Sequence, residues 1–256
     1  MPTFDPTFTE KGLMAEDEKE RSESGAEIIR HMDRTREWKQ AENPAGHLEE
    51  VEAHVEKHLG KIETVYHELV SDMVHIDILF VPADKTRPYH VLVTSGVSDQ
   101  PMKVPEGAEE FRRAELLIAL PANWPLTREA FEDEKNYWPL RWLKVVGRLP
   151  HEYGSWIGWG HTIPNGDPPA KIENTDFIGV MLAPPYWLPA EFFQLESKSC
   201  GKISFYQMTP LYLEEMDLKL KQGADELESR FEKADLGFVL DIKRKNVAAK
   251  KKWFGK

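Results

Sequence analysis

Cysteine is almost absent from this chain, which has Cys200 alone among 256 residues. A single cysteine excludes an internal disulfide and any cysteine-based zinc cluster, and it suits a reducing compartment. No apolar run approaches the roughly 20 residues that cross a bilayer, and the opening stretch MPTFDPTFTEKG lacks the basic-then-apolar pattern of a signal peptide. We therefore expect a cytoplasmic protein with no membrane partner.

Basic residues are outnumbered by acidic ones, 33 against 44, and the formal net charge is −11. Residues 243–256 hold seven Lys or Arg and no acid, so the preceding part carries 26 basic against 44 acidic groups, a balance of −18. Such an acidic body repels phosphate backbones, which argues against nucleic-acid binding and favours a protein partner with a basic surface. The basic tail is typical of a solvated terminus, although its Trp253 and Phe254 leave contact with nucleic acid or membrane open.

Phosphate-binding motifs are also missing. Gly154, Gly158 and Gly160 do not form a GxGxxG between a strand and a helix, and no GxxxxGKS or GxxxxGKT occurs. We therefore expect no nucleotide and no other cofactor.

The chain divides into three parts by composition. Residues 1–46 form a polar, charge-dense extension that we expect to be largely mobile, residues 47–246 form one domain, and residues 247–256 form the basic tail. Within the extension, Ile28, Ile29 and Met32 indicate one side of a short helix ending near Trp38.

Periodicity predicts most elements of the domain. Leu48, Val51, Val55 and Leu59 recur at helical spacing before Gly60, which predicts a helix over 48–59. Alternating or β-rich runs predict strands over 62–66, 74–81, 89–94, 115–120, 177–182, 203–208 and 238–242. Two further helices are expected, one around 213–222 and one carrying Leu227 and Phe231. Strands in groups with helices between them favour an α+β fold, a mixed, largely antiparallel sheet flanked by helices in a single sandwich domain.

The middle of the chain, residues 136–165, is rich in tryptophan. Pro139 is expected in the first turn of a helix that carries Leu140, Leu143 and Val146 inward and stops at Pro150. Residues 151–165 contain several glycines and no settled period, so we expect a compact loop. Its large aromatic side chains are covered by the core or by a partner.

Four motifs carry a resemblance to a known family. They are LPHEYGSWIGWGHTIPNG (149–166), TSGVSDQPMKVPEG (94–107), RAELLIALP (113–121) and FYQMTPLYLEEMDLKL (205–220). Together they closely resemble the suppressor-of-fused domain family, particularly its bacterial members, from about residue 51 to residue 246. The resemblance implies a non-enzymatic protein-binding module. Animal members hold a zinc-finger transcription factor, whereas bacterial members have been proposed as immunity proteins that neutralise polymorphic toxins.

The resemblance also implies where a partner binds. Animal members capture an extended peptide beside a sheet edge. By this resemblance, the tyrosine and aspartate that they use correspond to Leu149 and Gly160 here, and we expect no counterpart of their second, C-terminal domain in this sequence. These two departures put the transcription-factor clamp in doubt and leave generic protein binding. The partner-binding residues expected here are Leu149, His151, Trp156, Trp159, Gly160, His161 and Asn165.

An enzyme is the alternative interpretation. His75 and Asp77 are alternate strand residues on one side and suggest a proton-transfer pair with a distant serine such as Ser95. His151 and His161, with Glu152, have ligand types that zinc takes, but glycines separate them and no HExxH helix holds them. We therefore expect no catalytic residue and no metal, and interpret these side chains as structural.

Overall fold

The computed structural model describes residues 20–31, 41, 47–68 and 71–249 of the chain. The expected helix through Met32 to Trp38, most of the extension that we expected to be mobile and the tail with Trp253 lie outside these residues.

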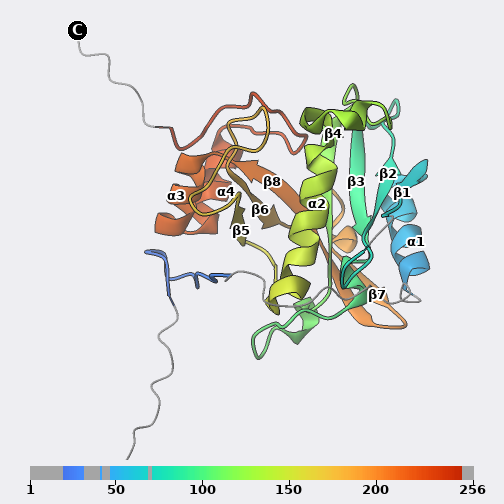
Figure 1. Ribbon diagram of the computed structural model, residues 1–256, viewed down its shortest axis with the longest axis horizontal. Coiled ribbons are helices and arrows are strands. Elements are labelled where there is room, and N and C mark those ends of the chain that lie inside the picture. The colour runs from blue at the N-terminus through green and yellow to red at the C-terminus, as the bar shows by residue number, and fades with distance from the viewer. Residues whose placement is uncertain (1–19, 32–40, 42–46, 69–70, 250–256) are drawn as a thin grey trace, which may run out of the picture.

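The fold is one large mixed sheet with helices on both faces and at one end (Figure 1). Its strands are β1 (Thr64–Tyr66), β2 (Asp77–Val81), β3 (Tyr89–Ser95), β4 (Ala114–Pro121), β5 (Thr162–Pro164), β6 (Gly179–Ala183), β7 (Gln194–Ser197) and β8 (Gly201–Leu211). The helices are α1 (Leu48–Leu59), α2 (Glu134–Tyr153), α3 (Leu213–Gln222) and α4 (Ala224–Lys233).

The sheet order is β1-β2-β3-β4-β8-β6-β5, and β7 pairs with β8. The β4–β8 pair is parallel, and the other pairs are antiparallel. This topology confirms the expected α+β class and its mixed, largely antiparallel sheet. Strands β1 and β5 lie at opposite ends of the strand order, so the two ends of the sheet offer separate surfaces.

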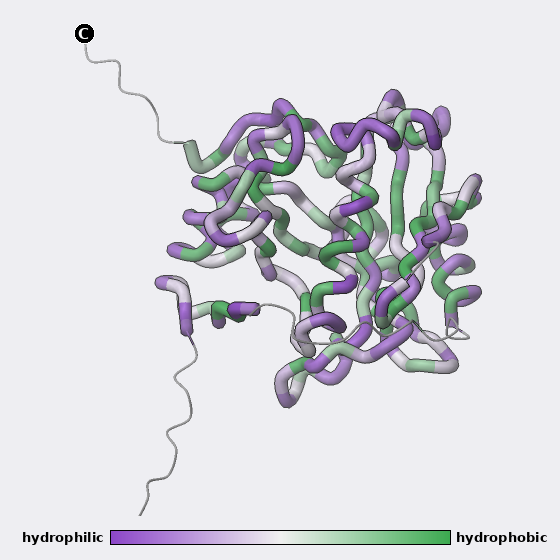
Figure 2. The backbone as a smooth tube through the Cα atoms, viewed as in Figure 1, coloured by the Kyte–Doolittle hydropathy of each residue, from purple (hydrophilic) through white to green (hydrophobic). Residues whose placement is uncertain are grey.

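Alternation along the strands places the core on both faces of the sheet. In β2, Ile78 and Phe80 pack with the large cluster under α2, whereas Leu79 and Val81 pack with the smaller cluster under α1. The central strands are coloured as largely hydrophobic segments in Figure 2, as expected for strands that are buried on both faces. A sheet buried on both faces in this way is a rigid platform for the loops at its ends.

Helix α1 confirms its sequence pattern, because Val51, Val55 and Leu59 are buried and Gly60 follows at φ 93°. Helix α2 corrects two expectations. It begins at Glu134, where the Asp133 side chain caps it by accepting a hydrogen bond from the Lys135 N–H, so Pro139 lies beyond the first turn.

Helix α2 also continues through Pro150 to Tyr153, although we expected Pro150 to stop it. Gly154 adopts a left-handed conformation, φ 60°, and its N–H donates to the Pro150 carbonyl. This cap satisfies the helix end three residues beyond the proline, so the expected loop starts with a last turn of helix.

Three other expectations differ from the structure. Strands β5 and β7 were not expected, because strands of three and four residues are too short to show a period. Residues 238–242 form no strand. They make one isolated bridge, Ala119 with Val239, because the Asp241 side chain accepts from the Lys243 N–H and turns the chain away.

The described part of the extension, residues 20–31, lies against the domain near β5 and α3 (Figure 1). The Ser24 N–H donates to the Leu220 carbonyl at 3.1 Å, and the ring of His31 stacks on Tyr153 with centroids 4.3 Å apart. Ile28 and Ile29 follow a tight turn rather than a helix, since a bridge between Arg21 and Glu27 closes this segment on itself.

A buried carboxylate fastens the loop after β3. Glu115 is fully buried and accepts hydrogen bonds from Thr94 Oγ1, the Gly96 N–H, and both the N–H and Oγ of Ser98. Burial raises the pKa of Glu115 to about 7, and these hydrogen bonds oppose that shift. Gly96 has φ 119°, and a Cβ there would lie 1.9 Å from the His75 carbonyl oxygen, so only glycine fits this turn.

Candidate partner-binding surface

Four of the expected partner-binding residues gather where the chain enters β5. The ring of His161 meets that of Trp156 edge-on, with centroids 4.3 Å apart. Trp156 is half-buried against the core under α2. Burial and the nearby Lys219 charge lower the pKa of His161 to about 4, so this imidazole is neutral at physiological pH. Trp156 and His161 thus form a half-buried, neutral aromatic pair.

Trp159 is the exposed member of this group, with 54% of its surface accessible. Its indole Nε1 donates a hydrogen bond to Glu228 Oε1 on α4 at 2.9 Å. Gly160 also lies close to α4, because a Cβ at this position would be 3.3 Å from the Cβ of Ala224. Its N–H donates a hydrogen bond to the Leu182 carbonyl of β6. Loop and helix together present a large apolar ring beside a carboxylate.

The other three expected residues are engaged inside the fold. Leu149 is half-buried against the core. His151 is buried, its Nε2 lies 3.0 Å from the Val97 carbonyl oxygen, and burial lowers its pKa to about 4. The Asn165 amide donates to the carbonyls of residues 170 and 171. These contacts match the backbone-satisfying role that polar loop residues commonly have.

Beside Trp159 lies a groove of about 880 Å³ between strands β6 and β8, α4 and the segment that follows α4. Its acidic lining residues are Asp225, Glu228, Glu232, Asp235 and Asp241. Its aromatic lining residues are Tyr186, Trp187, Phe231 and Phe238. We call this surface the acidic groove.

The aromatic lining of the acidic groove is ordered by mutual stacking. Trp187 and Phe238 lie parallel with centroids 4.3 Å apart, and Tyr89 meets the edge of both rings. The Trp187 Nε1 donates to Gln207 Oε1, whose amide in turn donates to the Phe238 carbonyl. Rings held in this way form a firm apolar floor that loses little entropy when a ligand binds.

The acidic groove keeps its negative charge although Arg244 lines it. Two guanidinium nitrogens of Arg244 bond the fully buried Glu215 carboxylate at 2.6 and 2.7 Å. The guanidinium also lies over the rings of Phe177, Tyr212 and Phe231. Its charge is therefore compensated within the fold.

At the rim of the acidic groove, burial and the carboxylates of residues 228 and 225 raise the pKa of Tyr186 to about 12.

Sequence reasoning missed the acidic groove, although a signal was present. Asp225, Glu228, Glu232 and Asp235 follow one another at steps of three, four and three residues, which is the spacing of one helix face. We used this segment only to locate the apolar stripe of Leu227. The acidic face next to this short apolar stripe was the indication of a charged surface.

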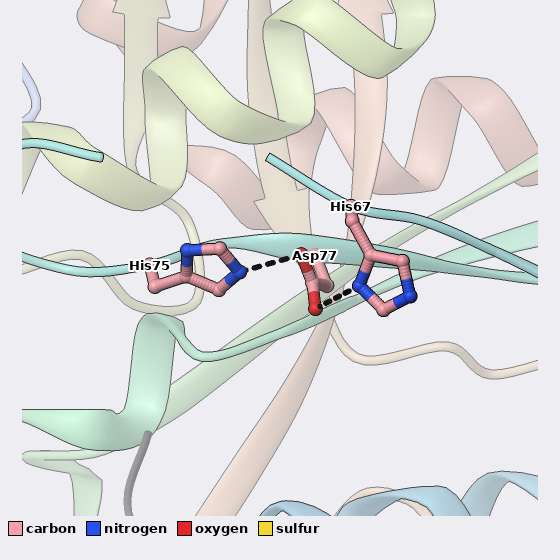
Figure 3. A group of neighbouring side chains, drawn as sticks. All are labelled: His67, His75 and Asp77. Carbon is pink, nitrogen blue, oxygen red and sulfur yellow. Dashed lines mark hydrogen bonds and ion pairs between the residues drawn. The ribbon is translucent and has the colours of Figure 1, made fainter. Parts of the chain in front are cut away.

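A second cluster brings together His67, His75 and Asp77 (Figure 3). Asp77 Oδ2 lies 2.8 Å from His67 Nδ1, and Asp77 Oδ1 lies 2.9 Å from His75 Nε2. The expected His75–Asp77 pair is thus present, but the hydroxyl that bonds His75 is that of Ser71, at 2.7 Å, and not that of Ser95.

Within the described ranges, this is the one group of three or more potential ligands close enough to share a metal ion. It contains neither His151 nor His161, so the expected alternative that combined those two histidines is not assembled. Among the helices in these ranges, none has the length and apolarity of a bilayer span.

Comparison with known proteins identifies the family. The family model described as "Suppressor of fused protein (SUFU)" matches residues 72–245. A suppressor of fused homologue from Neisseria gonorrhoeae is 18% identical with a TM-score of 0.57, covering 80% of this chain and 98% of that chain.

Two further solved structures share the fold. The Sufu–Fu complex is 15% identical with a TM-score of 0.55, covering 80% of this chain and 93% of that one. Drosophila Suppressor of Fused is 14% identical with a TM-score of 0.53, covering 81% of this chain and 52% of that one. A comparison with curated proteins found no match.

Proposed function

The chain belongs to the suppressor of fused family, and from this premise we propose that it is a protein-binding module that neutralises a basic toxin partner by covering it. The observation that carries the proposal is the acidic groove beside Trp159. Its aromatic side chains are surrounded by carboxylates, which suits a partner segment that presents basic side chains around an apolar anchor.

The net charge of the body also favours binding of a basic partner, through long-range electrostatic attraction. The acidic groove is part of a body, residues 1–242, that carries a charge balance of −18. Complementary charge speeds encounter between partners, and this steering weakens as salt rises. Binding should therefore show an association rate that depends strongly on salt and a dissociation rate set by the apolar contacts.

Strand β5 offers the partner a second kind of contact. In the described residues it pairs only with β6 and forms the end of the strand order. An extended peptide can add to such an edge through main-chain hydrogen bonds, while side-chain pockets give specificity. A relative of the same fold has been crystallised as the Sufu–Fu complex. We propose the β5 edge and the acidic groove as one continuous docking region.

The toxin partner, the bacterial origin and the cytoplasmic location are parts of the proposal that rest on the motif resemblance and on the lack of disulfides. An immunity protein of this kind acts by occlusion, so no turnover accompanies its effect. Its activity is a stoichiometric loss of the toxin's activity.

The test begins with a search of the neighbouring genes for a toxin and continues with a titration of the purified chain against the toxin found. We expect binding with an association rate that falls steeply between low and high salt. Glu232→Lys, which reverses an exposed charge of the acidic groove, should slow association. Glu52→Lys, an equally exposed reversal on α1, is the matched control. Equal binding by both variants would reject the acidic groove, and turnover of a substrate lost on replacing His75 would favour the enzyme.

A further inference from the structure

The open ends of β1 and β2 bring three potential metal ligands together. Tyr66 pairs with Ile78 in the register of these antiparallel strands, so one step further His67 stands opposite Asp77. His75 precedes Asp77 by two residues, and alternate residues of an extended chain point to the same side. The hairpin geometry therefore converges two imidazoles and a carboxylate on one point (Figure 3).

We propose that His67, His75 and Asp77 bind a divalent transition-metal ion, with zinc as the best match. The donor atoms of the three side chains all lie within 4.8 Å of one another. Zinc takes imidazole nitrogen and carboxylate oxygen at about 2.0–2.2 Å, so ligand atoms around it stand slightly further apart than the 2.8 and 2.9 Å seen here. A small rotation of the exposed His67 ring opens that space.

The hydrogen bonds of His75 favour a cation at its Nε2. Ser71 Oγ donates to Glu68 Oε2 at 2.7 Å, so toward the His75 Nδ1, also at 2.7 Å, it acts as an acceptor and Nδ1 carries the proton. The Nε2 atom then faces the Asp77 carboxylate at 2.9 Å, so the two groups can bind the same metal ion.

The residues behind the cluster form the supporting layer that metal-binding histidines usually have. The series of hydrogen bonds from Glu68 through Ser71 to His75 fixes the orientation of the His75 ring. The Glu68 N–H donates to Asp77 Oδ1 at 3.0 Å. Arg148 donates to both oxygens of Glu68 at 2.7 Å and neutralises that carboxylate. Asp77 is therefore the anionic ligand.

Access and chemistry limit the identity of the ion. The His67 side chain is 68% exposed, so water can complete the coordination sphere. Two nitrogen ligands suit zinc or cobalt better than magnesium or calcium, which prefer oxygen. The site lies at the β1 end of the strand order, away from β5. A bound ion would fasten the β1–β2 hairpin without touching the docking region proposed above.

The experiment is a titration of the chelator-treated, full-length protein with Zn²⁺ by calorimetry, repeated with Co²⁺ by visible absorption. We expect one equivalent to bind and the cobalt complex to show d–d bands with nitrogen ligation. Asp77→Asn, His75→Gln and His67→Gln should each weaken binding at least about 10-fold, and Ser71→Ala by about 10- to 100-fold.

His90→Gln is the matched control. Both ring nitrogens of His90 are engaged by main chain, the N–H of Ala83 and the carbonyl of Ala122, and its replacement should leave zinc affinity unchanged. Circular dichroism checks that each variant is folded, and His67→Gln, an exposed change, keeps the test valid if His75→Gln unfolds. Absence of binding by the wild-type protein, or wild-type affinity in Asp77→Asn and His67→Gln, would overturn the site.

Discussion

Trp159 and Glu228 are joined by a hydrogen bond of 2.9 Å across 69 residues of sequence. The bond fixes an exposed indole at the rim of the acidic groove. Burial raises the pKa of its partner, the Glu228 carboxyl. An aromatic ring held in place before binding loses little rotamer entropy on association, which is the property of a binding hot spot.

Trp159→Ala should therefore weaken partner binding by at least about 2 kcal/mol, mainly through faster dissociation. Surface plasmon resonance against the partner measures both rates. Val145→Ala, another exposed apolar side chain on α2 at 46% accessibility, is the control and should bind like wild type. If a folded Trp159→Ala protein keeps full affinity, the indole is not an anchor.

The core position of Leu143 predicts a second contrast on the same helix. Leu143 is fully buried whereas Val145 is 46% exposed. Leu143→Ala should lower the free energy of unfolding by about 2–5 kcal/mol, because a cavity remains, and Val145→Ala should change it by less than about 0.5 kcal/mol. Urea titrations followed by tryptophan fluorescence measure both, and equal losses would contradict the burial described here.

The buried imidazole of His151 predicts a loss of stability in acid. Burial lowers its folded-state pKa from 6.5 to about 4. Between these values the unfolded chain holds more protons on this ring than the folded one, so stability falls as pH falls through this window. From about pH 7 to about pH 5 this single group contributes a loss of about 2 kcal/mol.

His151→Gln should remove that part of the pH dependence, since an amide does not titrate here and its N–H₂ group can still reach the Val97 carbonyl. Urea titrations at the two pH values, for wild type and variant, provide the measurement. An unchanged difference between the two pH values in His151→Gln would show that other groups cause the acid sensitivity.

Glu115 predicts a large effect from a nearly isosteric change. All four of its hydrogen bonds come from donors, so the amide nitrogen of Glu115→Gln would face at least one N–H or O–H without an acceptor. A buried mismatch of this kind costs about 1–3 kcal/mol. Glu110→Gln, whose side chain is 49% exposed, is the control, and comparable small effects on thermal unfolding would contradict the buried network.

How much could be predicted depended on the length of the periodic pattern. Helix 48–59 and strands such as 203–208 were found because their apolar residues repeat over several turns or pairs. Strand β7 was missed because four residues are too few to show a period, although it pairs locally with the start of β8. Strand β5 was missed because its pairing with β6 spans the loop between them. A Cβ at Gly179 would lie 2.4 Å from the Ile163 carbonyl oxygen, so the β5–β6 contact rests on one glycine that no local pattern marks.

The candidate sites were less predictable for the same reason. His75 and Asp77 were recognised as neighbours because they are alternate strand residues, but His67 and Ser71 reach them only through the hairpin register. Trp159 was recognised from its loop, whereas its partner Glu228 belongs to a helix far along the chain. A pattern within one element is visible in the sequence, and a contact between elements is not.

Residues 20–31 contact the domain at two points near β5, through His31 with Tyr153 at the end of α2 and through Ser24 with Leu220 in α3. In thermodynamic terms they are a tethered competitor, present at a high effective concentration because they belong to the same molecule. A partner strand that adds to β5 has to work against this resident segment, and its apparent affinity is reduced by the fraction of molecules in which the segment is seated. The extension would thereby set the threshold concentration at which a partner is captured.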